Sequence, residues 1–247
     1  MRRKARQSTK AENRPRFWGK HAVAAALDND ERRVVRLWLT REAAEFLVPP
    51  KEIPVTFADV ADLGRLVPND APHQGMVAEV ERLEDILLAD LLDGAEDGRP
   101  LLVLDQVTDP HNVGAILRSA AAFDALGIVT QDRHAPPESG ALAKAASGAL
   151  ETVPWARVVN LSRALDEMAE AGFWRIGLAG EATQSLADAL GPVRVALVLG
   201  AEGEGMRHNT AAHCDALAKL PISERMESLN VSNAAAIALY AARAAAS

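Results

Sequence analysis

The chain is poor in several residue types that build common classes of site. Cys214 is the single cysteine in 247 residues, so no intramolecular disulfide can form and no thiol cluster is available for zinc. Aromatic residues make up only 4% of the sequence, while plentiful alanine and leucine favour helices that pack through small side chains. Sparse cysteine is typical of proteins in a reducing compartment, which predicts a cytoplasmic protein.

Long apolar runs and nucleotide-binding fingerprints are also missing from the sequence. No apolar run approaches the roughly 20 residues that a membrane-spanning helix needs. The N-terminal Met1-Arg2-Arg3-Lys4 is basic, but polar residues follow it where a signal peptide has its apolar core. The dinucleotide fingerprint G-x-G-x-x-G does not follow the strand that we expect to end at Leu104. These absences argue against membrane association and against a NAD site.

Charge is unevenly distributed along the chain, whose formal net charge is −7. Residues 1–16 carry seven Lys or Arg against Glu12 alone, a local charge of +6 that leaves −13 on the remainder. A basic arm on an acidic body is a common means of holding nucleic acid phosphates. A disordered, solubilising tail would have the same composition, so both interpretations of the arm stay open.

Changes in pattern divide the chain into an arm, a small domain, a linker and a larger domain. Residues 17–80 alternate short elements, with strands expected at 34–39, 53–57 and 75–80 and helices at 21–27, 41–48 and 58–67. Leucine, acidic residues and glycines then mark a linker. We therefore expect a basic arm at 1–16, an α/β domain at 17–80, a linker at 81–97 and a second domain at 98–247.

The second domain has the pattern of an α/β fold with a mostly parallel sheet. Apolar runs alternate with helical stretches, and runs such as 195–199 are continuously apolar, as in strands covered by helices on both faces. The expected strands lie at 101–104, 126–130, 173–179, 193–199 and 217–221. Ligands of such sheets bind in loops at the carboxyl ends of the strands.

Two of the loops at these strand ends carry unusual residues. Asp105 to Asn112 runs from a strand into a helix, for which Asn112 is a plausible N-cap, and Arg118 lies at the margin of that helix's apolar stripe. Taken alone, Arg118 is an ordinary solvated charge. The run Gly200 to Gly205 has three glycines, which permit close approach to a ligand or simply form a turn.

A third polar segment, Ser228-Leu229-Asn230-Val231-Ser232, precedes an alanine-rich helix expected at 233–246. Any one of Ser228, Asn230 and Ser232 could cap that helix. In extended backbone these three side chains would project on one side and the two apolar ones on the other. Such a row suits a ligand that has a charged end and a flat apolar ring.

Together, residues 105–118, 199–206 and 221–232 resemble the three signature motifs of the SpoU family of RNA ribose 2′-O-methyltransferases, within the SPOUT superfamily. Residues 17–80, with Trp18-Gly19-Lys20-His21 and His73-Gln74-Gly75, resemble the family's RNA-binding domain, which is similar to ribosomal protein L30e. The resemblance implies a deep C-terminal trefoil knot, a homodimer, and S-adenosylmethionine as methyl donor without a metal. Within the family, the chain is most similar to the bacterial subgroup that methylates a guanosine ribose in 23S rRNA.

The resemblance also assigns roles to residues of this chain. It implies a reaction site formed by Asn112, Arg118, Glu202, Ser228 and Asn230, in which Arg118 acts on the ribose hydroxyl as a base or as a stabiliser of the alkoxide. It implies a donor site formed by Leu178, Ala179, Leu199, Gly200, Glu202, Gly203, Leu220, Ile222, Ser228 and Leu229. One departure is that Glu224 and its neighbours stand where the family usually has a glycine, between Pro221 and Ser228.

Three classes of function remain to be separated. The first is an RNA ribose methyltransferase, acting on 23S rRNA or on tRNA. The second is a non-catalytic RNA-binding or ribosome-assembly factor of the same fold, against which the intact Asn112, Arg118, Glu202 and Asn230 argue. The third is another small-molecule enzyme on a nucleotide-binding sheet, which the missing dinucleotide fingerprint disfavours.

Overall fold

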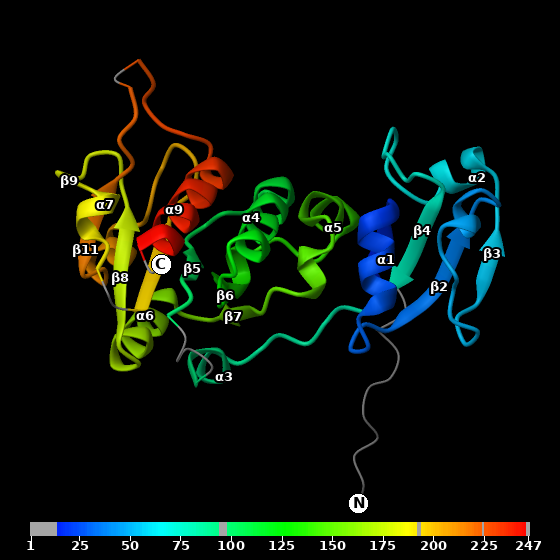
Figure 1. Ribbon diagram of the computed structural model, residues 1–247, viewed down its shortest axis with the longest axis horizontal. Coiled ribbons are helices and arrows are strands. Elements are labelled where there is room, and N and C mark those ends of the chain that lie inside the picture. The colour runs from blue at the N-terminus through cyan, green and yellow to red at the C-terminus, as the bar shows by residue number, and fades with distance from the viewer. Residues whose placement is uncertain (1–13, 94–97, 192–193, 224, 246–247) are drawn as a thin grey trace, which may run out of the picture. The chain divides into compact units, whose positions relative to one another are not determined.

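The computed structural model describes residues 14–93, 98–191, 194–223 and 225–245, and these form two compact units (Figure 1). The first unit contains the chain up to Glu84 together with Glu138–Glu151. The second contains Asp85–Pro137 and the chain from Thr152 onward. The sequence pattern placed residues 138–151 in the larger domain, whereas the structure packs them with the smaller one. Most of the basic arm, residues 1–13, lies outside the described residues.

The first unit is built on a four-stranded sheet with the order β1 (Arg16–Trp18), β4 (Met76–Val80), β2 (Val34–Leu39) and β3 (Val55–Phe57). Strand β4 runs antiparallel to β1 and β2, and β3 is parallel to β2. Helices α1 (Lys20–Asp28) and α2 (Val60–Gly64) accompany the sheet. The three predicted strands are therefore confirmed to within two residues.

The helix predicted at 41–48 is wrong. The segment forms a single turn of 3-10 helix, η1 (Ala43–Glu45), in which Thr40 Oγ1 accepts a hydrogen bond of 3.2 Å from the Ala43 N–H. Pro49 and Pro50 follow at once, and a proline disfavours helical backbone in the residue before it. The turn therefore ends before an α-helix can extend.

Residues 138–151 are tied to the first unit by a buried ionic cluster. Their helix α5 (Gly140–Ala146) and 3-10 turn η3 (Ala149–Glu151) are flanked by two carboxylates that meet the fully buried side chain of Arg32. Arg32 donates to Glu138 at 2.6 Å and to Glu151 at 2.9 Å. A buried charge is tolerated only with such partners, so removing both carboxylates would leave a costly unpaired guanidinium.

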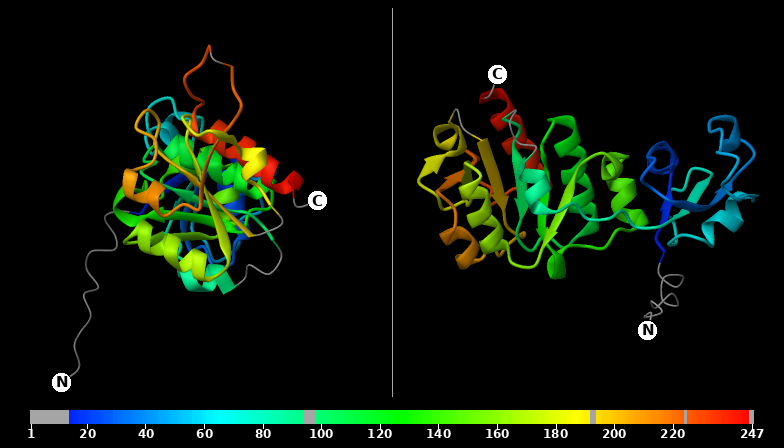
Figure 2. Two further views of the ribbon diagram at one scale, coloured as in Figure 1. Left: turned by 90° about the vertical axis from the view of Figure 1, so that its left-hand side faces the viewer. Right: turned by 90° about the horizontal axis from the view of Figure 1, so that it is seen from below.

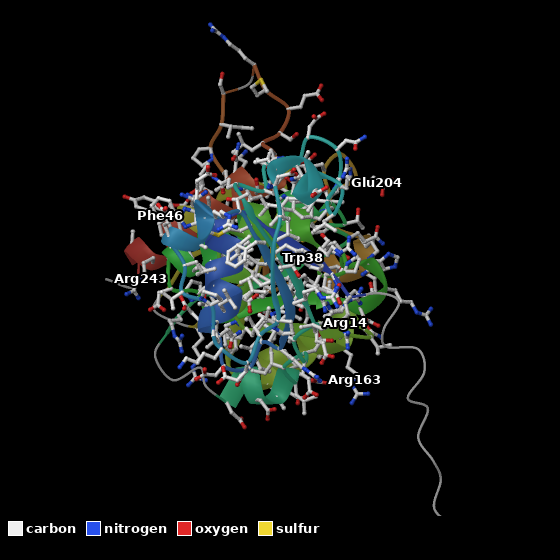
Figure 3. All side chains as sticks on the ribbon, turned by 90° about the vertical axis from the view of Figure 1, so that its right-hand side faces the viewer. Arg14, Trp38, Phe46, Arg163, Glu204 and Arg243 are labelled. Atoms are coloured by element: carbon white, nitrogen blue, oxygen red, sulfur yellow. The ribbon has the colours of Figure 1, made fainter. Side chains whose placement is uncertain are left out.

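A glycine allows α5 to reach the core of this unit. Trp18, Trp38, Leu63 and Val77 form that core, and Figure 3 shows Trp38 surrounded by the ribbon. A Cβ on Gly140 would lie 1.8 Å from a ring carbon of Trp18, a separation that no real Cβ contact has. The close packing of α5 on β1 therefore requires glycine at position 140.

We predict that Gly140→Ala destabilises the first unit by about 1–3 kcal/mol, because the added methyl group must displace the Trp18 ring. Urea unfolding followed by tryptophan fluorescence measures the change. The matched control is Gly64→Ala in α2, where an added Cβ meets nothing within 4 Å. Equal stability of the two variants would contradict the assigned packing.

The second unit contains a seven-stranded sheet, and every strand pair among the described residues is parallel. The strand order is β7 (Trp155–Val158), β6 (Gly127–Gln131), β5 (Leu101–Leu104), β10 (Arg194–Leu199), β8 (Phe173–Leu178), β11 (Ala216–Lys219) and β9 (Gln184–Ser185). The predicted parallel α/β fold is confirmed. Strands β7 and β9 were not predicted, because both are short and lack a continuous apolar run.

Helices cover both faces of this sheet (Figure 2). On one face α4 (Pro110–Ala122) packs against α9 (Val231–Ala245). On the other, α3 (Leu88–Asp93) and α6 (Leu161–Glu170) enclose an apolar core with the strands, so α3 arises within the segment expected to be a linker. The short elements η2 (Asp132–His134), α7 (Leu186–Ala189) and α8 (His208–Ala212) complete the unit. Among the described residues, no helix is long and apolar enough to cross a membrane.

Candidate functional site

Three loops of the second unit meet in a hydrogen-bonded cluster at the carboxyl ends of the strands. Asn112 Nδ2 donates to Glu202 Oε1 at 3.2 Å, and Asn230 Nδ2 donates both to Asn112 Oδ1 at 3.0 Å and to Glu202 Oε1. The Val231 N–H approaches the same carboxylate oxygen at 3.4 Å. Glu202 and Asn230 are exposed, so the cluster is open to a ligand from solvent. We call Asn112, Glu202 and Asn230 the amide–carboxylate cluster.

Helix α4 starts earlier than expected, and this frees Asn112. The predicted N-cap at Asn112 is wrong, because Asp109 caps the helix by accepting a bond from the His111 N–H at 3.0 Å. Pro110 occupies the first helical position, where its missing N–H costs nothing. Asn112 therefore lies in the first turn, and its side chain is free to bind Glu202.

Asn230 both begins α9 and contributes to the cluster. Its Oδ1 accepts from the Ser232 N–H at 2.9 Å and from the Ser232 hydroxyl, while its Nδ2 binds Asn112 and Glu202. The helix starts at Val231, so Ser232 lies in its first turn. The predicted extended row of three polar side chains is therefore wrong for Ser232, although capping by Asn230 was one of the stated alternatives.

The loop that carries Glu202 is a tight reversal that depends on glycine. Ala201 and Gly205 exchange backbone hydrogen bonds of 3.1 and 3.0 Å. A Cβ on Gly200 would lie 2.1 Å from the Gly205 carbonyl carbon, and Gly203 adopts a left-handed φ of 79°. The glycines therefore let the chain fold back on itself directly after β10.

A buried carboxylate fixes the other end of this loop. Asp105, which is 0% exposed, accepts bonds from the Arg207 N–H at 3.0 Å and from Arg207 Nε at 2.8 Å. Arg207 also donates to Gln131 Oε1 at 2.8 Å, and the Asp105 N–H donates to the Leu199 carbonyl at 2.8 Å. The sequence pattern did not predict this role for Asp105, although a carboxylate directly after a buried strand was a signal for it.

The loops that follow β8, β10 and β11, with the start of α9, enclose a cavity of about 420 Å³, a size typical of small-molecule sites. Every residue that the family resemblance assigned to donor binding lines it: Leu178, Ala179, Leu199, Gly200, Glu202, Gly203, Leu220, Ile222, Ser228 and Leu229. The charged lining residues are Glu181, Glu202, Glu204 and Glu227 against Lys219, an excess of carboxylate. Apolar walls with acidic groups suit a ligand that combines a flat ring with a positive charge. Glu224 lies outside the described residues.

No hydrogen bond joins the Arg118 side chain to the amide–carboxylate cluster in the described part of the chain. It follows Asn112 by six residues in α4, which places the two side chains about 120° apart around the helix axis. The Arg118 side chain is exposed, and no hydrogen bond or ion pair joins it to the described part of the chain. Of the predicted reaction-site residues Asn112, Arg118, Glu202, Ser228 and Asn230, hydrogen bonds join Asn112, Glu202 and Asn230.

An ion pair joins β8 to the segment that leads into β11, and both strands end at the cavity. Arg175 donates to the two carboxylate oxygens of Asp215 at 2.8 and 2.7 Å. This contact lowers the pKa of Asp215 and raises the pKa of Arg175.

Cys214, which precedes Asp215, is packed against the backbone of β8. Its Sγ lies 3.1 Å from the position that a Cβ on Gly177 would take. Burial raises the pKa of the Cys214 thiol to about 11.

We predict that Cys214 resists alkylation in the folded protein. With its pKa raised from 9.0 to about 11, the thiolate fraction at pH 8 should fall about a hundredfold, and iodoacetamide labelling should slow accordingly. Because the folded state prefers the protonated thiol, this group's contribution to stability is intact below pH 9 and is lost as the pH rises toward 11.

Labelling rates from pH 7 to 10 test this prediction, with urea-unfolded protein as the control. The unfolded chain should level off near the ordinary thiol pKa of 9.0, while the folded chain should continue to rise with pH. A folded-state rate that levels off near pH 9 would contradict the assigned burial.

Comparison with known proteins places the chain in a family. The SpoU rRNA Methylase family matches residues 99–240, and a domain described as RNA 2′-O ribose methyltransferase substrate binding matches residues 17–86. The chain belongs to the SpoU family.

Individual relatives agree with this membership. The chain is 44% identical to the 23S rRNA (guanosine-2′-O-)-methyltransferase RlmB of Ralstonia nicotianae, over 91% of this chain and 93% of that protein. It is 37% identical to the enzyme of the same name from Pseudomonas putida, over 92% and 95%. The SpoU methyltransferase AviRb from Streptomyces viridochromogenes, solved in complex with the cofactor AdoMet, shares the fold with a TM-score of 0.77 and 24% identity, over 93% of this chain and 89% of that one.

Proposed function

We propose that this protein transfers the methyl group of S-adenosylmethionine to the 2′-hydroxyl of a guanosine ribose in 23S rRNA. Two relatives that align with this chain over nearly their full length are named for that activity. The observation that carries the proposal is the contact of Asn112, Glu202 and Asn230 beside a cavity that Glu202 also lines. This arrangement places a donor-sized pocket next to side chains that can bind a sugar.

The cavity lining fits the donor. Gly200 and Gly203 leave backbone groups accessible, and the apolar Leu199, Leu220 and Leu229 can enclose an adenine ring. The surrounding carboxylates suit a cationic sulfonium compound. When bound, S-adenosylmethionine supplies an already activated methyl group, so the residues of this chain need only prepare the ribose oxygen.

Preparing that oxygen means positioning the hydroxyl and stabilising the charge that develops as its proton leaves. Glu202 orients Asn112 and Asn230, whose amide groups can donate to and accept from ribose hydroxyls. A guanidinium stays protonated at neutral pH, which makes general-base action by Arg118 unfavourable. In this proposal Arg118 instead binds a neighbouring phosphate and stabilises the alkoxide, the hydroxyl proton passes to solvent water, and the new oxygen–methyl bond would replace the sulfur–methyl bond of the donor, which would leave as S-adenosylhomocysteine.

A homodimer would explain why, in the described part of the chain, no hydrogen bond joins Arg118 to the amide–carboxylate cluster. Helix α9, which packs beside α4, exposes Ile237 and Tyr240 to solvent. We propose that two copies pair through this face, that Arg118 of one copy completes the site of the other, and that the C-terminal segment forms the trefoil knot implied by the family. The cytoplasm, where rRNA is assembled, is the compartment that this activity requires.

Gly200→Ala should weaken S-adenosylmethionine binding by about tenfold or more, because the new methyl group would overlap the Gly205 backbone and distort the cavity. Calorimetric titration measures the affinity, and circular dichroism monitors folding. The control is Gly191→Ala, where an added Cβ meets nothing within 4 Å. If the Gly200→Ala variant bound S-adenosylmethionine with unchanged affinity, the donor would not bind in this cavity.

Arg118→Lys should reduce methyl transfer about a hundredfold while donor affinity stays unchanged, because lysine lacks the planar fork of donors. Transfer of labelled methyl to a 23S rRNA transcript measures the rate, and Arg163→Lys on the exposed part of α6 is the control. Only a slight loss, with RNA binding unchanged, would exclude both the base and the stabiliser roles.

Mixed dimers of the Arg118→Lys and Gly200→Ala chains distinguish the two placements of Arg118. If Arg118 acts across the dimer, a mixed dimer keeps one intact site and regains about half of the activity per dimer. Inactive mixed dimers would show that Arg118 acts within its own chain.

The target class is tested by comparing acceptors. Purified protein with labelled donor should methylate a 23S rRNA transcript and leave a tRNA pool unlabelled. Labelling of tRNA alone would favour the tRNA alternative. Donor binding or RNA binding without transfer to either acceptor would favour the non-catalytic assembly factor.

A further inference from the structure

The first unit contains a second cavity, of about 380 Å³, that lies outside the donor site. It is formed between the end of β2 with η1 on one side and the turn that precedes β4 on the other. Its lining combines apolar groups with Lys20, Glu42, His73 and Gln74. The volume falls within the range of pockets that hold small organic groups.

The turn at the base of this cavity has an uncommon backbone conformation. Gln74 and Gly75 both have left-handed backbone, with φ of 54° and 77°. A Cβ on Gly75 would lie 2.6 Å from Thr40 Oγ1, and the Gly75 carbonyl accepts from the Thr40 N–H at 2.9 Å. Left-handed backbone at a non-glycine residue is costly and concentrates at functional sites.

Gln74 uses this conformation to hold two lysines in place. Its Oε1 accepts from the Lys20 N–H at 3.1 Å and from the Lys144 ammonium at 2.8 Å. Lys144 belongs to α5, in the segment that the chain inserts between β6 and β7. The Lys20 ammonium in turn lies 4.0 Å from the centre of the Phe46 ring.

Phe46 is the unusual member of this group. It lines the cavity although its side chain is 71% exposed, and Figure 3 shows it at the periphery of the ribbon. An exposed aromatic ring with one lysine ammonium against it, and a second lysine bound to Gln74 in the cavity wall, is a combination suited to single-stranded nucleic acid, in which bases stack on rings and lysines contact phosphates.

We propose that this cavity binds an unstacked nucleotide of the RNA substrate, with its base on Phe46 and its phosphates at Lys20 and Lys144. This inference rests on the proposed function, since it takes RNA as the substrate. This cavity belongs to the first unit, whereas the donor cavity and the amide–carboxylate cluster belong to the second.

Binding of the full-length protein to a 23S rRNA transcript tests the proposal. Phe46→Ala should weaken binding about tenfold or more, Lys20→Gln should weaken it and reduce its salt dependence, and Phe46→Trp should retain the affinity. The matched controls are Phe57→Ala in β3 and Lys51→Gln, which are exposed in the same unit but do not line the cavity. Donor affinity should be equal in all variants.

Cross-linking identifies the contact directly. RNA that carries 4-thiouridine, irradiated with the wild-type protein and digested, should yield a labelled peptide that contains Phe46. The proposal is overturned if the affinity of Phe46→Ala for the 23S rRNA transcript is within about twofold of that of Phe57→Ala. It is also overturned if an acidic peptide binds this cavity more tightly than RNA does and displaces the RNA. Failure of wild-type methyl transfer would refute the proposed function separately, because these binding measurements need no turnover.

Discussion

One carboxylate oxygen, Oε1 of Glu202, joins the three loops on which the site depends. It accepts hydrogen bonds from Asn112 of the first loop and from Asn230 and the Val231 N–H of the third. Bonds to an ionised acceptor are roughly twice as strong as those between neutral groups. The parallel sheet brings the strand ends to one edge, but this carboxylate sets how the loops meet there.

Much of the surrounding structure serves to present that oxygen. Gly200 allows the loop after β10 to reverse, and the buried Asp105 holds the far end of the loop through Arg207. Capping of α4 by Asp109 leaves the Asn112 amide free, while Asn230 caps α9 with its oxygen and binds Glu202 with its nitrogen. The residues that reverse the loop and cap the two helices therefore also determine where Glu202 lies relative to Asn112 and Asn230.

The sequence predicted the parallel sheet from its continuous apolar runs, and the family resemblance pointed to residues that line the cavity of about 420 Å³. It did not predict contacts that depend on three-dimensional packing. Arg32 is buried against Glu138 and Glu151, more than a hundred residues away, and Gly140 fits only against Trp18. No local pattern marks residues 138–151 as part of the first unit. Hydrogen bonds join Glu202 to Asn112 and Asn230, a set of contacts that depends on how the loops pack.

The central claim is that these loops form one site for methyl donor and ribose, acting on 23S rRNA. Mapping ribose methylation at nucleotide resolution, in cells that express the wild-type protein or its Glu202→Ala variant, tests that claim most directly. The account predicts that one guanosine of 23S rRNA carries a 2′-O-methyl group with the wild-type protein and loses it with the variant. An unchanged 23S rRNA methylation pattern would contradict the account.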